Sequence, residues 1–288
     1  MLRNLSIFIF VFVLAAQLKA QYSPINTISW NNNSLYNPAA TAINYKHDAT
    51  IGSAFDNNRF YGQEWNSSSY ALYNYRWDKI NSGIGVSYEF YNSDFRTRSR
   101  IAFNYAYQFH LKDDRLLSLG ASYGFDRVTI NYSNVQSWGI EPLRPIPSED
   151  ETYTLSDARI GAMFKSHKLL VGISLDSRTN IHGEWNDVLT LSMNMSYDFS
   201  VGNNFKLSPG IYAFTKIDYF NYADLSLKTT FKDRYWIGMV VDFADPYSSV
   251  GGFAGIDIKG NYRIGYSYRR FSMSNCDVNE LVFRLMIK

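Results

Sequence analysis

Cysteine is almost missing from the sequence, and so is any strong excess of charge. The 288 residues contain a single cysteine, Cys276, so no intramolecular disulfide can form. The 28 lysines and arginines nearly balance the 26 aspartates and glutamates, which leaves no basic surplus for binding nucleic-acid phosphates. Hydrophobic residues make up 46% of the chain and charged ones only 19%, which excludes a disordered protein. We therefore expect a folded protein without a nucleic-acid partner.

Long apolar runs are also scarce. Residues 7–16 (IFIFVFVLAA) form one, but it is about half the roughly 20 residues that a membrane-spanning helix needs. The run follows Arg3 and precedes the small residue Ala20, as in a secretory signal peptide. We assign residues 1–20 to such a peptide, whose removal would leave a formally neutral exported chain. No later run reaches helix length, which excludes a helical membrane protein.

Aromatic residues are abundant instead. The chain holds 23 Tyr, 20 Phe and 6 Trp. In residues 100–111 and 187–199, large apolar side chains occupy every second position, and small or polar side chains fill the positions between them. This period of two is typical of a β-strand with two different faces and does not fit the 3.6-residue period of a helix. The pattern predicts an all-β fold.

About fourteen such strands can be counted, each close to the length of a membrane-crossing strand. Their predicted centres are Ile51, Tyr73, Val86, Tyr105, Ala121, Gly161, Val171, Met193, Tyr212, Leu227, Met239, Ala254, Tyr266 and Phe283. Short turns alternate with longer connections, above all residues 56–68, 127–155 and 177–186. This layout predicts a transmembrane antiparallel β-barrel of about 14 strands, of the outer-membrane type, in residues 47–288. Residues 21–46 are predicted to be an N-terminal periplasmic segment.

The composition of the two strand faces predicts which one points outward. Opposite the large apolar face lie Ser, Gly, Asn, Thr, Asp and a few Arg, with little Lys or Glu. A soluble barrel would show Lys and Glu on its outside, so we expect the apolar face to contact outer-membrane lipid and the small polar face to line a crowded interior. Tyr75, Trp77, Tyr235 and Trp236 lie near strand ends and fit aromatic girdles at the two membrane interfaces.

No motif with a catalytic mechanism stands out, and we expect no enzymatic activity, metal or cofactor. The four histidines, His47, His110, His167 and His182, fall in different predicted strands and connections, so they form no local ligand cluster. A Gly-x-Ser-x-Gly elbow is absent. Spacing alone leaves open a Ser-His-Asp site assembled from distant strands.

Two stretches do not fit the strand pattern. Residues 22–46 are rich in Asn and contain Asn37-Pro38-Ala39. Residues 136–152 hold three prolines, which argue against a regular strand and predict an external loop. Loops on a rigid scaffold often carry binding residues. The candidate partner contacts in this external loop are Trp138, Glu141, Arg144, Glu149, Asp150 and Glu151.

Six short motifs follow one another along the mature chain: residues 36–39 (YNPA), 120–125 (GASYGF), 168–174 (KLLVGIS), 207–212 (LSPGIY), 235–238 (YWIG) and 264–268 (IGYSY). Together they resemble the PorP/SprF outer-membrane proteins of the type IX secretion system of Bacteroidetes. The resemblance implies a barrel that supports secretion or surface attachment of large exported proteins, including those used for gliding motility. It implies other type IX secretion components and an exported client as partners, and Asn37, Pro38 and Ala39 as a candidate contact motif.

Two functions from different classes remain open. The first is an accessory protein of the secretion apparatus, which binds partners through residues 127–155 and 22–46. The second is an outer-membrane porin or ligand-specific channel, in which the interior of the barrel does the work. A porin would line its interior with opposed charges, whereas the predicted inner face is rich in Gly, Ser and Asn. This composition favours a filled or narrow barrel.

Overall fold

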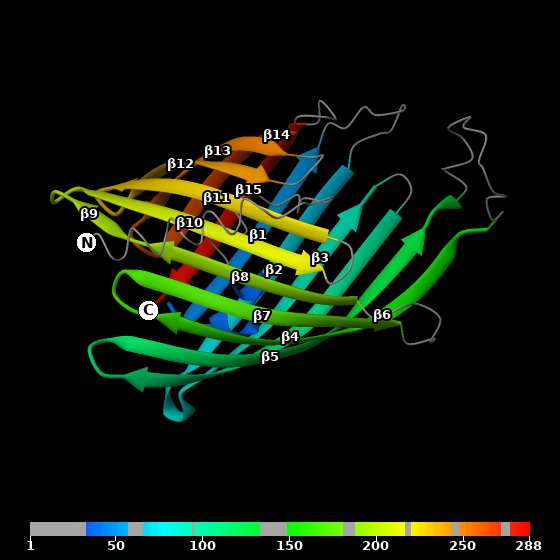
Figure 1. Cartoon of the computed structure of the whole chain (residues 1–288), viewed down its shortest axis with the longest axis horizontal. Coiled ribbons are helices and arrows are strands. Elements are labelled where there is room, and N and C mark those ends of the chain that lie inside the picture. The colour runs from blue at the N-terminus through cyan, green and yellow to red at the C-terminus, as the bar shows by residue number, and fades with distance from the viewer. Residues whose placement is uncertain are drawn as a thin grey trace.

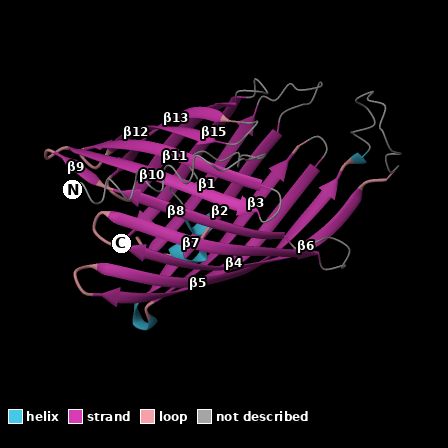
Figure 2. Cartoon of the chain, viewed as in Figure 1, coloured by secondary structure: helices cyan, strands magenta, loops and turns pink. Residues whose placement is uncertain are grey.

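The computed structural model describes residues 33–56, 66–93, 96–132, 149–180, 188–216, 220–243, 248–271 and 277–288. Figure 1 and Figure 2 show an arrangement built almost entirely of strands. The strands are β1 (His47–Asp56), β2 (Asn66–Trp77), β3 (Ser82–Asn92), β4 (Arg96–Leu111), β5 (Arg115–Ile130), β6 (Glu151–Lys165), β7 (Leu169–Asn180), β8 (Val188–Tyr197), β9 (Phe199–Val201), β10 (Phe205–Lys216), β11 (Phe220–Phe231), β12 (Tyr235–Phe243), β13 (Ser249–Ile258), β14 (Tyr262–Phe271) and β15 (Asp277–Ile287). Short 3-10 turns are η2 (Asn33–Leu35), η3 (Pro38–Ala40) and η5 (Asp78–Ile80).

The strands close into an antiparallel barrel. Successive strands pair along the chain, and β15 pairs with β1 over the full length of β1, from His47 with Ile287 to Asp56 with Val278. The short β9 continues the course of β8 beyond Asp198, and both pair with β10. Within the described residues, β8 and β9 therefore make one barrel strand, and the barrel has 14. This confirms the predicted number, and all of the predicted centres lie in strands.

The connections are short at one end of the barrel. Turns of a few residues join β2 to β3, β4 to β5, β6 to β7, β11 to β12 and β13 to β14. They lie at the left and lower edge of Figure 1. Several turn residues, including Asn81, Asp113 and Asp233, have a positive φ, which Asn and Asp adopt more readily than most residues. We call this end the turn side and the opposite end the loop side.

The predicted loop at residues 127–155 is shorter in the structure, which corrects its boundaries. β5 and β6 remain paired as far as Ile130 and Glu151, and the side-chain hydroxyls of Thr129 and Thr152 hydrogen bond at 2.9 Å. The sequence predicts shorter strands here because the prolines between β5 and β6 interrupt the alternation. The connection therefore spans residues 131–150, and Glu151 belongs to β6.

The apolar strand face points outward, as predicted. Phe103 is 60% exposed and Ile237 64%, whereas their inward-facing neighbours Ala102 and Trp236 are buried. Because outward apolar side chains can contact lipid tails, this orientation suits a membrane barrel. One girdle assignment is wrong: Tyr235 does face outward, but the Trp236 ring lies inside, against the backbone of Gly255. Among the described residues, no helix has the length and apolarity that a membrane crossing takes.

Candidate functional site in the barrel interior

The interior is occupied by the chain's own residues 33–46, which we call the inner segment. Its core is η3, where Pro38 takes the first position and the Asn37 side chain accepts a hydrogen bond from the Ala39 N–H at 2.9 Å. This is a standard start for a helical turn, since the side chain satisfies an otherwise unpaired N–H and proline lacks one. The Thr41 hydroxyl then donates to the Pro38 carbonyl at 2.7 Å. The Asn-Pro-Ala motif thus folds the segment locally.

The side-chain amide of Asn37 also fixes the inner segment to the barrel wall. Its Nδ2 atom donates to the carbonyl oxygens of Ala162 on β6 at 3.2 Å and Ile173 on β7 at 3.1 Å. Asn37 is only 2% exposed, so water does not replace these bonds. Buried amides left without partners carry a substantial desolvation penalty, which makes this anchor specific for Asn.

Four more wall residues hold the same segment. Arg159 donates to the Leu35 carbonyl at 2.5 Å and Ser174 to the Tyr36 carbonyl at 2.9 Å. Gln108 donates to the Thr41 carbonyl at 3.2 Å, and Asn74 to the Ser34 hydroxyl at 3.1 Å. These donors come from β2, β4, β6 and β7, so the segment is bonded to several strands of the barrel.

Glycines on the inner face make room for the segment. A Cβ atom at Gly120 would overlap the backbone at Pro38 and Ala39, and one at Gly83 would overlap the Thr41 carbonyl oxygen. At Gly161 and Gly172 it would meet the Asn37 amide. These glycines lie on neighbouring or nearby strands and form a seat for η3 and the residue after it. The alternation placed them on the inner face, but nothing local indicated what they accommodate.

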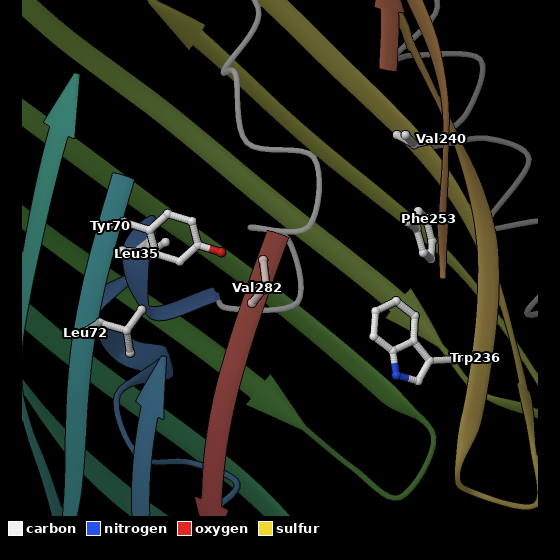
Figure 3. Packing of buried hydrophobic residues seen from close by; sticks show 7 residues of the cluster. All are labelled: Leu35, Tyr70, Leu72, Trp236, Val240, Phe253 and Val282. Carbon is white, nitrogen blue, oxygen red and sulfur yellow. The ribbon is translucent and has the colours of Figure 1, made fainter. Parts of the chain in front are cut away.

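Apolar contacts supplement the polar anchors. Ala39 and Ile43 pack with Leu116 of β5 and Met163 of β6. Leu35 belongs to a second buried cluster with Tyr70, Leu72, Trp236, Val240, Phe253 and Val282. Figure 3 shows Leu35 of η2 and the side chains that point into the interior from β2, β12, β13 and β15. The interior therefore contains hydrophobic packing as well as polar groups.

A buried charge network lies further toward the loop side. Arg100 binds Asp157 through two hydrogen bonds of 2.9 and 3.0 Å, and also pairs with Glu89. Arg159 pairs with Asp176 at 3.1 Å, and Arg178 with Asp157 at 3.2 Å. Arg100 and Asp157 are 1% and 0% exposed. Charges buried to this degree are tolerated because they are paired and hydrogen bonded.

Two further ion pairs cross the inner wall elsewhere. Arg269 of β14 contacts Asp242 at 3.0 Å and donates to the Tyr222 hydroxyl at 3.0 Å. Arg284 of β15 forms a two-pronged pair with Asp48 of β1, at 2.6 and 2.7 Å, across the seam that closes the barrel. The closing seam is thus joined by side chains as well as by backbone hydrogen bonds.

These networks correct the sequence-based view of the interior. We expected few opposed charges there, but Arg100, Asp157 and Arg159 all lie on the inner face. The strand alternation already placed them on that face; their pairing could not be read from the sequence because the partners come from different strands. The expected Gly-, Ser- and Asn-rich composition is present beside them.

A cavity of about 310 Å³ remains on the turn side, and we call it the turn-side cavity. Asn44 and Tyr45 of the inner segment form part of its wall, together with the β6–β7 turn at residues 166–168 and parts of β8, β10 and β11. Its charged lining residues are Lys165, Lys168, Asp198, Asp224, Lys228, Arg263 and Arg284. Cations therefore outnumber carboxylates in its wall.

The structure separates the sequence-predicted contact residues. Asn37, Pro38 and Ala39 are buried in the interior, and their contact with a partner stays a prediction that would require the inner segment to move. Glu149, Asp150 and Glu151 are exposed at the loop side. Trp138, Glu141 and Arg144 lie outside the described residues, as do the predicted signal peptide and residues 21–32.

The histidines do not converge in the part of the chain that the structure describes. His47 contacts the Tyr73 hydroxyl at 2.8 Å, and His167 lies 3.2 Å from Asp114 between two turns. His182 and Cys276 are outside the described residues. Over the described ranges, no group of three His, Cys, Asp or Glu side chains is arranged to hold a metal ion. The absence of enzymatic activity stays a prediction.

Comparison with known proteins identifies one family. A family model described as "Type IX secretion system membrane protein PorP/SprF" matches residues 18–286. No curated protein matches the chain.

Solved outer-membrane barrels share the fold. The P. putida toluene transporter TodX has a TM-score of 0.54 at 11% identity, and the match covers 89% of this chain and 94% of TodX. The Ralstonia pickettii toluene transporter TbuX has a TM-score of 0.53 at 8% identity, with 89% and 93% covered. The Acinetobacter baumannii outer membrane protein Omp33 has a TM-score of 0.50 at 12% identity, with 86% and 100% covered. At these identities the likeness shows the fold alone.

Proposed function

The chain belongs to the PorP/SprF family of type IX secretion system membrane proteins, and from that premise we propose that it is an accessory barrel that acts by binding other proteins. It is an outer-membrane β-barrel of the type IX secretion system. In the proposed role it supports the secretion or surface attachment of large exported proteins, among them adhesins used in gliding. Its partners would be a client of this kind and other components of the same system.

The occupied interior is the observation that carries this proposal. Hydrogen bonds from Asn37, Arg159 and Ser174 hold the inner segment in place. The glycines of the barrel wall let it pack closely against the strands. A barrel whose own chain fills part of its interior is less suited to free diffusion than an open one. The surfaces that remain accessible to a protein partner are the two rims of the barrel. Loops on a rigid scaffold commonly bind partners.

The alternative is a porin or ligand-specific channel. TodX and TbuX are toluene transporters according to their descriptions, and a barrel of this size can enclose a conducting path. The fully buried charges of the interior, however, are mostly engaged in close pairs such as Arg100 with Asp157. Paired and buried charges of this kind do not provide the open, opposed charges expected in a porin.

Deleting part of the longest loop-side connection tests the proposed role. Glu149, Glu151 and Thr152 should be retained, because β6 begins at Glu151 and Thr152 bonds to β5. Cells that carry only the variant lacking residues 138–148 should insert the barrel normally but display less client protein at the surface. A chain without the deletion, expressed at the same level, is the control.

Protease accessibility of the client on intact cells gives the readout. Normal client display in cells that lack the whole chain would contradict the proposed function. Normal display with the deletion alone would place partner binding elsewhere on the barrel.

A further inference from the structure

The turn-side cavity carries a cationic surplus, and we propose that it binds carboxylates of an acidic, unfolded stretch of an exported protein. This inference rests on the proposed function, because it names the chemistry by which a client would be recognised. The cavity wall holds the cations Lys165, Lys168, Lys228, Arg263 and Arg284 but only the carboxylates Asp198 and Asp224.

Neighbouring charges neutralise part of this set. Arg263 is engaged by Asp257 at 2.6 and 2.7 Å, and Arg284 by Asp48 at 2.6 and 2.7 Å. These two pairs therefore contribute little net charge to the cavity.

The carboxylates of the wall are also engaged. Asp198 accepts a hydrogen bond from the Ser208 hydroxyl at 2.6 Å and lies 3.9 Å from Lys206, while Asp224 lies 3.6 Å from Arg269. The backbone N–H of Asp198 donates to the Lys168 carbonyl at 2.7 Å, so Asp198 lies beside Lys168, although its carboxylate contacts Ser208 and Lys206. Among the described residues, neither Lys165 nor Lys168 forms an ion pair with a carboxylate of this chain.

Short turns of outer-membrane barrels face the periplasm, so the two lysines would lie where a segment arriving from the periplasm meets the barrel. Lys165 ends β6 and points to the inner side, and Lys168 is exposed in the turn that leads to β7. The other short turns hold four lysines, Lys79, Lys112, Lys232 and Lys259, and also four aspartates, Asp78, Asp113, Asp114 and Asp233, so the surplus of lysines is confined to the cavity.

The rest of the wall suits an extended peptide. Tyr45 and Tyr212 offer aromatic surface, and Ser196, Ser208 and Asn194 offer hydrogen-bonding groups beside the cations. A cavity of about 310 Å³ is at the small end of ligand sites, so it would take a few residues and not a folded domain. The chain's own residues 21–32 contain no Asp or Glu and cannot supply the carboxylates.

Binding of a short peptide of alternating Asp and Ser to the full-length protein in detergent tests the proposal. We expect K165Q/K168Q to weaken binding about tenfold. The matched control K79Q/K112Q removes two lysines from other short turns that do not line the cavity, and should weaken it less than about twofold. K165R/K168R, which keeps both charges, should retain binding, and an unboiled gel should confirm that each variant is folded.

Other outcomes overturn the proposal. Equal weakening by both glutamine pairs would mean that only the overall charge of the rim attracts anions. A control peptide has Asn in place of each Asp. If it binds as tightly as the Asp-Ser peptide, carboxylates are not recognised. If free glutamate at the same carboxylate concentration, or phosphatidylglycerol, displaces the peptide equally well, the site belongs to a small carboxylate or to lipid.

Client display in cells separates this inference from the proposed function. Loss of display without the chain, together with unchanged peptide binding by K165Q/K168Q, would refute the cavity assignment and leave the accessory role standing. Normal display without the chain, together with specific peptide binding, would refute the accessory role and leave the carboxylate site.

Discussion

Gly161 of β6 lies directly against the side chain of Asn37, so that a Cβ atom at residue 161 would overlap the Asn37 Oδ1 atom. The same Asn37 amide bonds to the carbonyl of Ala162, the residue next to Gly161. A position on the barrel wall and a position on the inner segment are therefore fitted to each other, although 124 residues separate them in the chain.

Adding a methyl group to the glycine seat should loosen the inner segment. Gly120→Ala and Gly161→Ala each place a Cβ atom in occupied space, which we expect to cost about 1–3 kcal/mol. Amide hydrogen exchange in residues 33–46 should become faster while the barrel strands stay protected. Gly252→Ala is the control, because a Cβ atom there meets only the Gly238 carbonyl oxygen at 3.7 Å. Unchanged exchange in the seat variants would show that the segment is not held there.

Removing the Asn37 side chain should release the segment in a second way. Asn37→Ala deletes the cap on Ala39 and both wall bonds, and caps alone contribute about 0.5–2 kcal/mol. We expect trypsin to cleave full-length protein in detergent faster after Lys46, the last residue of the inner segment. The control is Asn44→Ala, at an exposed position of the same segment, which trypsin should cleave at the wild-type rate. Equal rates for the two variants would rule out an anchoring role for Asn37.

Breaking a buried ion pair should destabilise the whole barrel. Arg100→Met removes the partner that Asp157 and Glu89 share. Asp157 keeps Arg159 and Arg178, so we expect a loss near the lower end of the range of about 3–5 kcal/mol that breaking a buried pair costs. Arg115→Met removes an exposed pair with Asp113 and should cost at most about 1 kcal/mol. Guanidinium unfolding of vesicle-embedded protein measures both changes. A small effect of Arg100→Met would mean that the network is not a structural support.

A charged side chain on the outward face should destabilise the barrel. Phe103→Arg puts a cation on the lipid-facing side near the middle of β4, and we expect a loss of about 2–4 kcal/mol in the same unfolding assay. Met193→Arg on β8 should behave alike, while Phe103→Leu should cost much less. If Phe103→Arg unfolded like the wild type, the assignment of the faces would fail.

Much of the fold could be predicted from local patterns, and the contents of the interior could not. Alternation in residues such as Ile101 to Leu111 depends only on neighbours in the chain, so the strands and their outer face followed from it. The bond between Arg159 and the Leu35 carbonyl joins residues 124 apart, and no local period reports such a contact. The inward position of Trp236 does follow from the alternation, because its neighbour Ile237 faces outward; the girdle assignment failed because it relied on residue type and strand-end position alone.

The conductance of the purified wild-type protein in planar lipid bilayers tests the central claim most directly. With residues 33–46 bonded inside the barrel, we expect the wild-type protein to show no steady open-pore conductance. Deletion of residues 33–44, which keeps Tyr45 and Lys46 next to β1, should raise the conductance markedly. A stable wild-type current of porin size, unchanged by the deletion, would contradict a filled, partner-binding barrel and favour the channel.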